Sequence, residues 1–81
     1  MLLSSITIER AFRLAKQIRN EVRRLRFEAG EMSQQDLADR VGVTRQTIIA
    51  IEKDKYSPSL EVAFKISEVF EVDLACVFSY S

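Results

Sequence analysis

The sequence predicts an all-α domain, and three observations support this prediction. Only two Gly and one Pro occur among the 81 residues, so few positions interrupt a helix. Apolar residues recur at intervals of three and four in several segments, which is the period of an amphipathic helix. Candidate capping residues precede three of these segments: Ser33, Thr44 and Asp73. Together they predict five helices in one small domain with a modest core.

The first helix is predicted to be long. Thr7 is a candidate N-cap, and Gly30 is a candidate stop. A continuous apolar stripe runs between them: Ile8, Phe12, Ala15, Ile18, Val22, Leu25 and Ala29.

Residues 34–53 predict two short helices joined by a tight turn. Ser33 can cap the first helix, Gly42 suits the left-handed position that ends it, and Thr44 can cap the second. The inward positions are apolar: Leu37, Ala38 and Val41, then Ile48 and Ile51. Two helices joined by a short turn containing Gly are typical of a helix-turn-helix motif, although a helical hairpin in a bundle is the alternative. The polar run 44–47 favours DNA binding, because Arg and Gln make bidentate contacts with guanine and adenine.

Two shorter segments predict the remaining helices. The fourth starts at Ser57-Pro58-Ser59, where either Ser could be the cap because Pro is favoured at the first helical position. Its expected inward face is Leu60, Ala63, Ile66, Ser67 and Phe70. Asp73 should cap a short fifth helix anchored by Leu74, Val77 and Phe78, and the tail 79–81 carries no strong signal.

The composition excludes several function classes. There is no His and only one Cys, so a His-based catalytic triad, a metal site and an internal disulfide are all excluded. The sequence contains no recognisable nucleophile–base pair or phosphate loop, so we expect neither an enzyme nor a cofactor. No apolar run approaches the roughly 20 residues that span a membrane, and the start of the chain is too short for a signal-peptide core. We therefore expect a cytoplasmic protein.

Charge is balanced overall but unevenly distributed. Twelve basic and twelve acidic residues give a net charge of zero, which argues weakly against DNA binding. Residues 10–26 are nevertheless strongly basic, and residues 61–81 are acidic. The basic segment either attracts phosphates or forms a solvated helix face, and both interpretations remain open.

These elements resemble the Cro and phage-repressor type of helix-turn-helix domain, also called the xenobiotic-response-element family. The matching segments follow the family's order: IRNEVRRLRFEAG, SQQDLADRVGVTRQTIIAIEKDK, YSPSLEVAFKISEVF and VDLACVF. The resemblance implies a five-helix, lambda-repressor-like domain over residues 18–81 that binds duplex DNA, usually as a dimer, to regulate transcription. Residues 1–17 would be an N-terminal extension, expected to be partly helical. This extension could fray, pack back on the domain or meet a second subunit.

The second helix of the motif should lie in the major groove with its N-terminal turn on the bases. Arg45 suits guanine, and Gln46 suits adenine or a phosphate. Ala50 matches a base-contacting position of the family but could touch only a thymine methyl. We assign the neighbouring Ile49 to the core edge in preference to thymine contact.

Other residues are expected to hold the DNA backbone. Gln34 opens the first helix of the motif, where backbone N–H groups attract a phosphate, and it matches the family's backbone clamp. The remaining expected backbone contacts carry hydroxyl or amino groups: Thr44, Thr47, Lys53 and Lys55. Arg26 and Glu52 match a partly buried ion pair of the family that orients the recognition helix. The alternative is two unrelated surface charges.

Two positions depart from the family's pattern. Lys53-Asp54 replaces the usual Asn-Gly, and an Asp charge near a phosphate is repulsive, although Asp tolerates the left-handed conformation. Glu71 stands where Gly usually ends a helix, and it would cost about 1 kcal/mol if the left-handed geometry is retained.

We expect a sequence-specific regulator of transcription whose partner is double-stranded DNA, with no small-molecule substrate or membrane partner evident. Repression by steric blocking, as a homodimer, is the simplest mechanism for a chain of this size. The alternative is a protein-interaction module, such as an antitoxin that neutralises a partner through residues 1–17 or the acidic C-terminal helices. The expected dimer seam is apolar: Cys76, Val77, Phe78 and Tyr80, with Ile8, Phe12 and Ala15 as the competitor.

Overall fold

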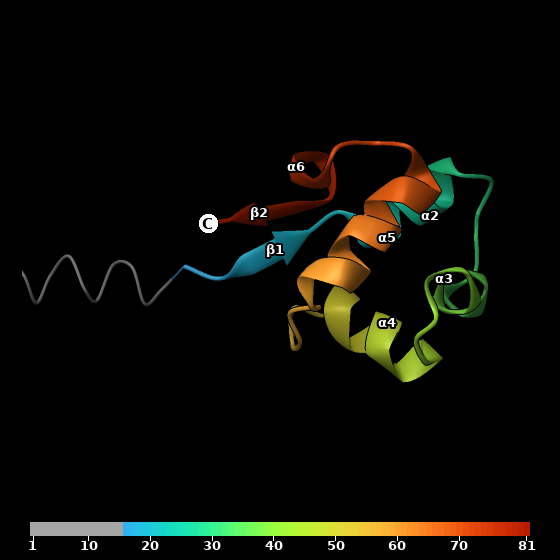
Figure 1. The fold of residues 1–81 in the computed structure, drawn as a ribbon, viewed down its shortest axis with the longest axis horizontal. Helices are drawn as coiled ribbons and strands as arrows, with labels where there is room; N and C mark the ends of the chain where they lie inside the picture. Colours follow the sequence, from blue (N-terminus) through green and yellow to red (C-terminus); the bar gives the residue numbers. More distant parts are fainter. Residues whose placement is uncertain (1–15) are drawn as a thin grey trace, which may run out of the picture.

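The computed structural model describes residues 16–81, in which five helices carry a small two-stranded sheet at one side (Figure 1). The elements in chain order are β1 (Ile18–Asn20), α2 (Val22–Glu28), α3 (Gln34–Val41), α4 (Arg45–Glu52), α5 (Leu60–Phe70), α6 (Leu74–Val77) and β2 (Phe78–Tyr80). The five-helix prediction is confirmed. The sheet was not predicted, and it lies where the two ends of the described chain meet (Figure 1).

The prediction of one long helix over residues 7–30 is wrong at residues 18–21. Residues 18–20 form β1, which pairs antiparallel with β2 so that Ile18 lies opposite Tyr80 and Asn20 opposite Phe78. Helix α2 begins only at Val22, because the Asn20 side chain accepts a hydrogen bond from the Val22 N–H at 3.1 Å and starts the helix there. The earlier part of the predicted stripe lies outside the described residues.

Short polar side chains start three of the helices. Ser33, Thr44 and Ser59 each accept a hydrogen bond from the backbone N–H three residues later, at 2.9, 3.2 and 3.2 Å. The predicted caps of α3 and α4 are therefore confirmed, and Ser59 is the one that caps α5. Asp73 precedes α6 as expected, but its side chain makes no capping hydrogen bond.

One apolar core joins all five helices. Its fully buried members come from each of them: Val22, Leu37, Ala38, Ile48, Ile51, Ile66 and Val77. The inward assignment of Leu60 is wrong, because this residue is 70% exposed at the first position of α5, beyond the edge of the core. Within residues 16–81, no helix combines the length and the apolar character that a membrane crossing requires.

Left-handed backbone occurs at three residues other than Gly among those described: Glu31, Asp54 and Glu71. Glu71 ends α5 with φ 55° and ψ 44°, so the left-handed geometry is retained in spite of the Glu side chain. This conformation costs about 1 kcal/mol relative to Gly. Asp54, with φ 59°, makes the turn after α4.

Candidate nucleic-acid interface

Helices α3 and α4 are the two helices of the motif, and hydrogen bonds fix the turn between them. Gly42 adopts φ 76°, and the N–H groups of Gly42 and Val43 both donate to the Ala38 carbonyl, at 2.9 and 3.0 Å. Ala38 is fully buried, and its small side chain lets the two helices pack closely. Thr44 then caps α4. The orientation of α4 relative to α3 is therefore set by local hydrogen bonds and by the core.

The outer face of α4 carries the residues expected to contact bases. Arg45 and Gln46 are exposed in its first turn, and Ala50 is half-buried one turn beyond Gln46. Within residues 16–81, neither Arg45 nor Gln46 makes a side-chain hydrogen bond or ion pair with another side chain. Arg45, Ile49 and Lys53 follow one another at intervals of four, so they lie along the same row of the helix. Both leading side chains are therefore exposed to solvent, with no partner among the described residues.

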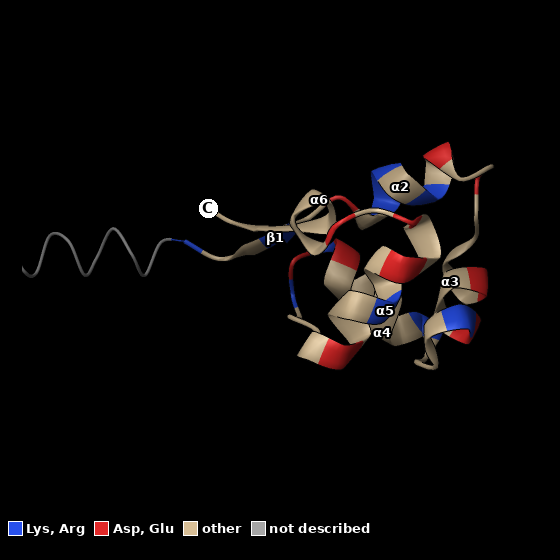
Figure 2. Ribbon diagram, turned by 45° about the horizontal axis from the view of Figure 1, so that its top comes forward, with Lys and Arg blue, Asp and Glu red and all other residues tan. Residues whose placement is uncertain are grey.

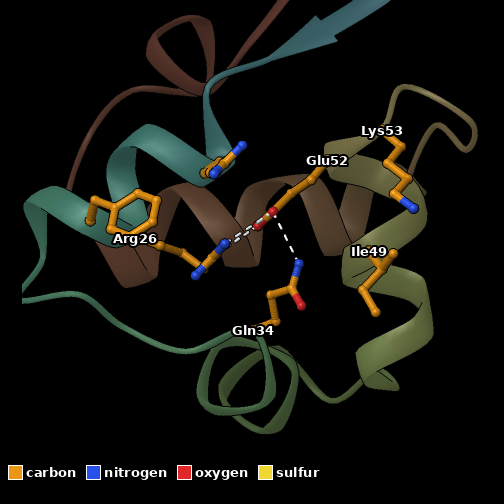
Figure 3. A pocket seen from close by; sticks show the side chains of 7 residues that line it. Arg26, Gln34, Ile49, Glu52 and Lys53 are labelled. Carbon is orange, nitrogen blue, oxygen red and sulfur yellow. Dashed lines mark hydrogen bonds and ion pairs between the residues drawn. The ribbon is translucent and has the colours of Figure 1, made fainter.

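A buried ion pair joins α2 to the end of α4 (Figure 3). Arg26 donates to Glu52 through Nε at 2.6 Å and through Nη2 at 3.0 Å, and the two side chains are only 9% and 7% exposed. Arg26 Nη1 also donates to the Met32 carbonyl at 2.7 Å, and Gln34 Nε2 donates to Glu52 Oε1 at 3.2 Å. The Glu52 carboxylate therefore connects α2, α3 and α4.

A polar hollow between α2, α3 and α4 is lined in part by this ion pair (Figure 3). Its lining comes from all three helices: Arg23, Arg26, Phe27, Gln34, Ile49, Glu52 and Lys53. The guanidinium carbons of Arg23 and Arg26 lie 5.7 and 5.6 Å from the centre of the Phe27 ring, a cation–π geometry. The hollow thus brings the exposed cations Arg23 and Lys53 together with Gln34 at the start of α3.

Arg23 is a residue that the motif-based assignment of contacts missed. The only signal for it in the sequence was its place in the basic segment, which does not distinguish it from Arg24. The structure does distinguish them. Arg24 donates to Glu21 at 2.7 Å and to Glu28 at 2.9 Å, and these hydrogen bonds raise its pKa. Arg23 makes no ion pair within residues 16–81, and basic positions lie along α2 in Figure 2.

The remaining expected contact residues lie at the two ends of α4. Thr44 and Thr47 have their hydroxyl oxygens 3.0 Å apart, and Thr44 is already engaged in the cap. Lys53 and Lys55 are exposed and flank the left-handed Asp54. The Lys55 N–H donates to the Ala50 carbonyl at 2.9 Å, which fixes the backbone at the exit of α4.

The sequence profile of the helix-turn-helix family matches residues 22–75, which include all five helices except the last residues of α6. The chain belongs to the helix-turn-helix family.

Three relatives of the chain are transcriptional regulators by name. A transcriptional regulator of this type from Methanocaldococcus jannaschii is 57% identical over 49 residues, covering 60% of this chain and 74% of the relative. The regulator YgzD of Bacillus subtilis is 48% identical over 61 residues, covering 75% and 91%.

The third relative is a repressor by name. RstR, the transcriptional repressor of the cryptic phage CTXphi from Vibrio cholerae, is 34% identical over 62 residues, covering 76% of this chain and 55% of RstR. A crystal structure from Bacteroides fragilis is similar with a TM-score of 0.69 and 24% identity, covering 78% of this chain and all of that one, which bears on the fold alone. The chain is thus a helix-turn-helix DNA-binding protein related to transcriptional regulators.

Proposed function

We propose that this protein binds a specific sequence in duplex DNA and represses transcription by blocking access to it, as a homodimer. The observation that carries this proposal is the pair of exposed side chains, Arg45 and Gln46, on the leading turn of a helix fixed by its N-cap and by core packing. Helices held in this way place their first turn against base edges in the major groove. The phage repressor among the relatives supports repression.

Base contacts are assigned to three residues on α4. Arg45 would donate both arms of its guanidinium to O6 and N7 of guanine, and Gln46 would pair with adenine. Ala50 lies one turn further along and offers only a methyl group to a thymine methyl. Ile49 lines the hollow beside Lys53, in agreement with a position at the core edge.

Backbone contacts are assigned to residues that surround α4. Gln34 gives one amide hydrogen to Glu52, and its position at the first turn of α3 leaves backbone N–H groups directed outward for a phosphate. The other contacts supply hydroxyl and cationic groups: Thr44, Thr47, Lys53, Lys55 and, from the hollow, Arg23. Arg26 and Glu52 would act indirectly, by holding α2, α3 and α4 at the spacing of the phosphates.

The proposed dimer seam keeps Phe78 and Tyr80 of the set expected from sequence but not Val77. Val77 is only 1% exposed and belongs to the core, so it cannot contribute to a seam. An apolar groove lies beside it instead, lined by Ile18, Ser57, Pro58, Leu60, Ala63, Leu74 and Phe78. Leu60 at 70% exposure and Tyr80 at 60% lie in the elements that border it, and large apolar side chains so exposed are candidates for a subunit contact.

Selection of DNA fragments by the purified protein, followed by sequencing, tests the proposal. We expect one enriched site with two-fold symmetry and half-sites about 34 Å apart. Sedimentation of the protein on that site should show two chains per duplex, and Leu60→Asp should reduce this to one. Failure to enrich any sequence, or a single half-site bound by one chain, would refute the proposal.

A further inference from the structure

One half-buried amide ties β1 to the turn that follows α4. Asn20 Nδ2 donates to the Ile51 carbonyl at 2.7 Å and to Asp54 Oδ1 at 3.0 Å, while Asn20 Oδ1 accepts from the Val22 N–H. A single side chain therefore joins the start of α2, the end of α4 and the turn. A separate backbone hydrogen bond ties the start of α2 to the end of α6, because the Glu21 N–H donates to the Val77 carbonyl at 2.8 Å.

The second oxygen of the Asp54 carboxylate is held by Arg19. Arg19 Nη1 donates to Asp54 Oδ2 at 3.3 Å, with the two side chains 47% and 30% exposed. Asn20 binds only Oδ1 of this carboxylate, and Arg19 binds Oδ2, so two residues of β1 together fix both oxygens. Asp54 lies between Lys53 and Lys55, two proposed phosphate contacts, and a free carboxylate there would pair with either amine or repel the phosphate.

We propose that Arg19 is a positioning residue for DNA binding, which holds the Asp54 carboxylate against β1 so that Lys53 and Lys55 remain available to phosphates. This inference rests on the proposed function. It accounts for the Asp at the turn after α4, which would otherwise oppose DNA binding. The sheet would then contribute to DNA binding indirectly, because Arg19 and Asn20, which hydrogen-bond the Asp54 carboxylate, both lie in β1.

A double-mutant cycle tests the inference: Arg19→Gln, Asp54→Asn and the two together. Asn tolerates the left-handed conformation of residue 54, so the turn is retained in both variants that carry it. Affinity is measured for the selected site and for random duplex at about 50 mM salt, where exposed charges are weakly screened. Thermal melting of each variant shows that the fold persists.

We expect Arg19→Gln to weaken binding to both duplexes about threefold to fivefold, since exposed ion pairs have effects of this size. Asp54→Asn alone should change affinity less than twofold, because the carboxylate is already held, and the double variant should return to within twofold of wild type. Unchanged binding by Arg19→Gln overturns the inference, as does a large gain from Asp54→Asn alone.

A double variant as weak as Arg19→Gln also overturns it, because Arg19 would then contact the DNA itself or act only through stability. These outcomes differ from failure of the proposed function, in which the wild-type protein would show no preference for any duplex. Lys65→Gln is a matched control, because this residue forms an exposed ion pair with Glu61 on α5, away from the turn. Its affinity for both duplexes should stay within twofold of wild type.

Discussion

Replacing Glu52 by Gln should destabilise the domain more than any surface substitution. The Glu52 carboxylate accepts two hydrogen bonds from Arg26 and one from Gln34, and both members of the ion pair are more than nine-tenths buried. Gln retains one acceptor oxygen but turns the other into a donor, so the Arg26 charge stays buried and loses its counter-charge. Breaking a buried pair in this way costs about 3–5 kcal/mol.

Urea unfolding followed by circular dichroism measures this loss directly. A domain of this size has a free energy of unfolding of about 5 kcal/mol, so a loss of about 3–5 kcal/mol should leave about 2 kcal/mol or less and shift the urea midpoint to far lower concentration. The matched control is Glu28→Gln, which breaks an exposed pair with Arg24 at 51% and 59% exposure. This control should change the free energy of unfolding by less than about 0.5 kcal/mol.

A second variant separates the buried charge from packing. Arg26→Met combined with Glu52→Leu removes both charges and keeps apolar bulk, so we expect recovery to within about 1 kcal/mol of wild type. Equal losses in the free energy of unfolding for Glu52→Gln and Glu28→Gln would refute the reasoning, because the Arg26–Glu52 pair would then behave as a surface ion pair. A double variant as unstable as Glu52→Gln would show that something other than an uncompensated charge is responsible.

Three further predictions follow from single residues. Glu71→Gly should raise the free energy of unfolding by about 0.5–1 kcal/mol in urea titrations, because Gly relieves the left-handed strain, whereas Glu68→Gly inside α5 should lower it by about 1 kcal/mol. Lys55→Ala should weaken binding to all duplexes equally and reduce the slope of log affinity against log salt by about one unit, and an unchanged slope would place Lys55 in solvent. Arg45→Ala should reduce the binding free energy for the selected site by about 1–3 kcal/mol and change that for random duplex little. Arg45→Lys should restore only part of this binding, because an ammonium group lacks the planar fork. Equal losses of binding free energy on both duplexes would make Arg45 a phosphate contact.

The helices were predictable from sequence because their determinants are local. Ser33, Gly42 and Thr44 act within four residues of themselves, and the apolar period of α3 and α4 lies in a single segment. The sheet was not predictable in this way. The conformation of Ile18 is decided by Tyr80, at the other end of the chain, and the apolar spacing of the first segment fits a helix equally well.

The residues of the candidate site differ in the same way: some were predictable from local sequence, and others depend on tertiary contacts. Exposure of Arg45 and Gln46 follows from their place on the first turn of an amphipathic helix, so the motif alone predicts it. The hollow around Arg23 and the grip of Arg19 on Asp54 depend on which helices and strands meet in space. Neither side chain has a spacing in the sequence that marks it as different from the other Arg residues of the basic segment.

The pairing of β1 with β2 also bears on the order in which the domain folds. Most helix contacts here join neighbours along the chain, whereas the sheet closes a loop of about sixty residues, whose ordering entropy opposes early formation. The strands should therefore pair after the helices have assembled, and their amide hydrogens should exchange with solvent faster than those of α3 and α4. Because β1 carries Arg19 and Asn20, the Asp54 carboxylate becomes fixed only in this last step, and fluctuations that open the sheet would release it while the helical core and the local hydrogen bonds of the turn stay intact.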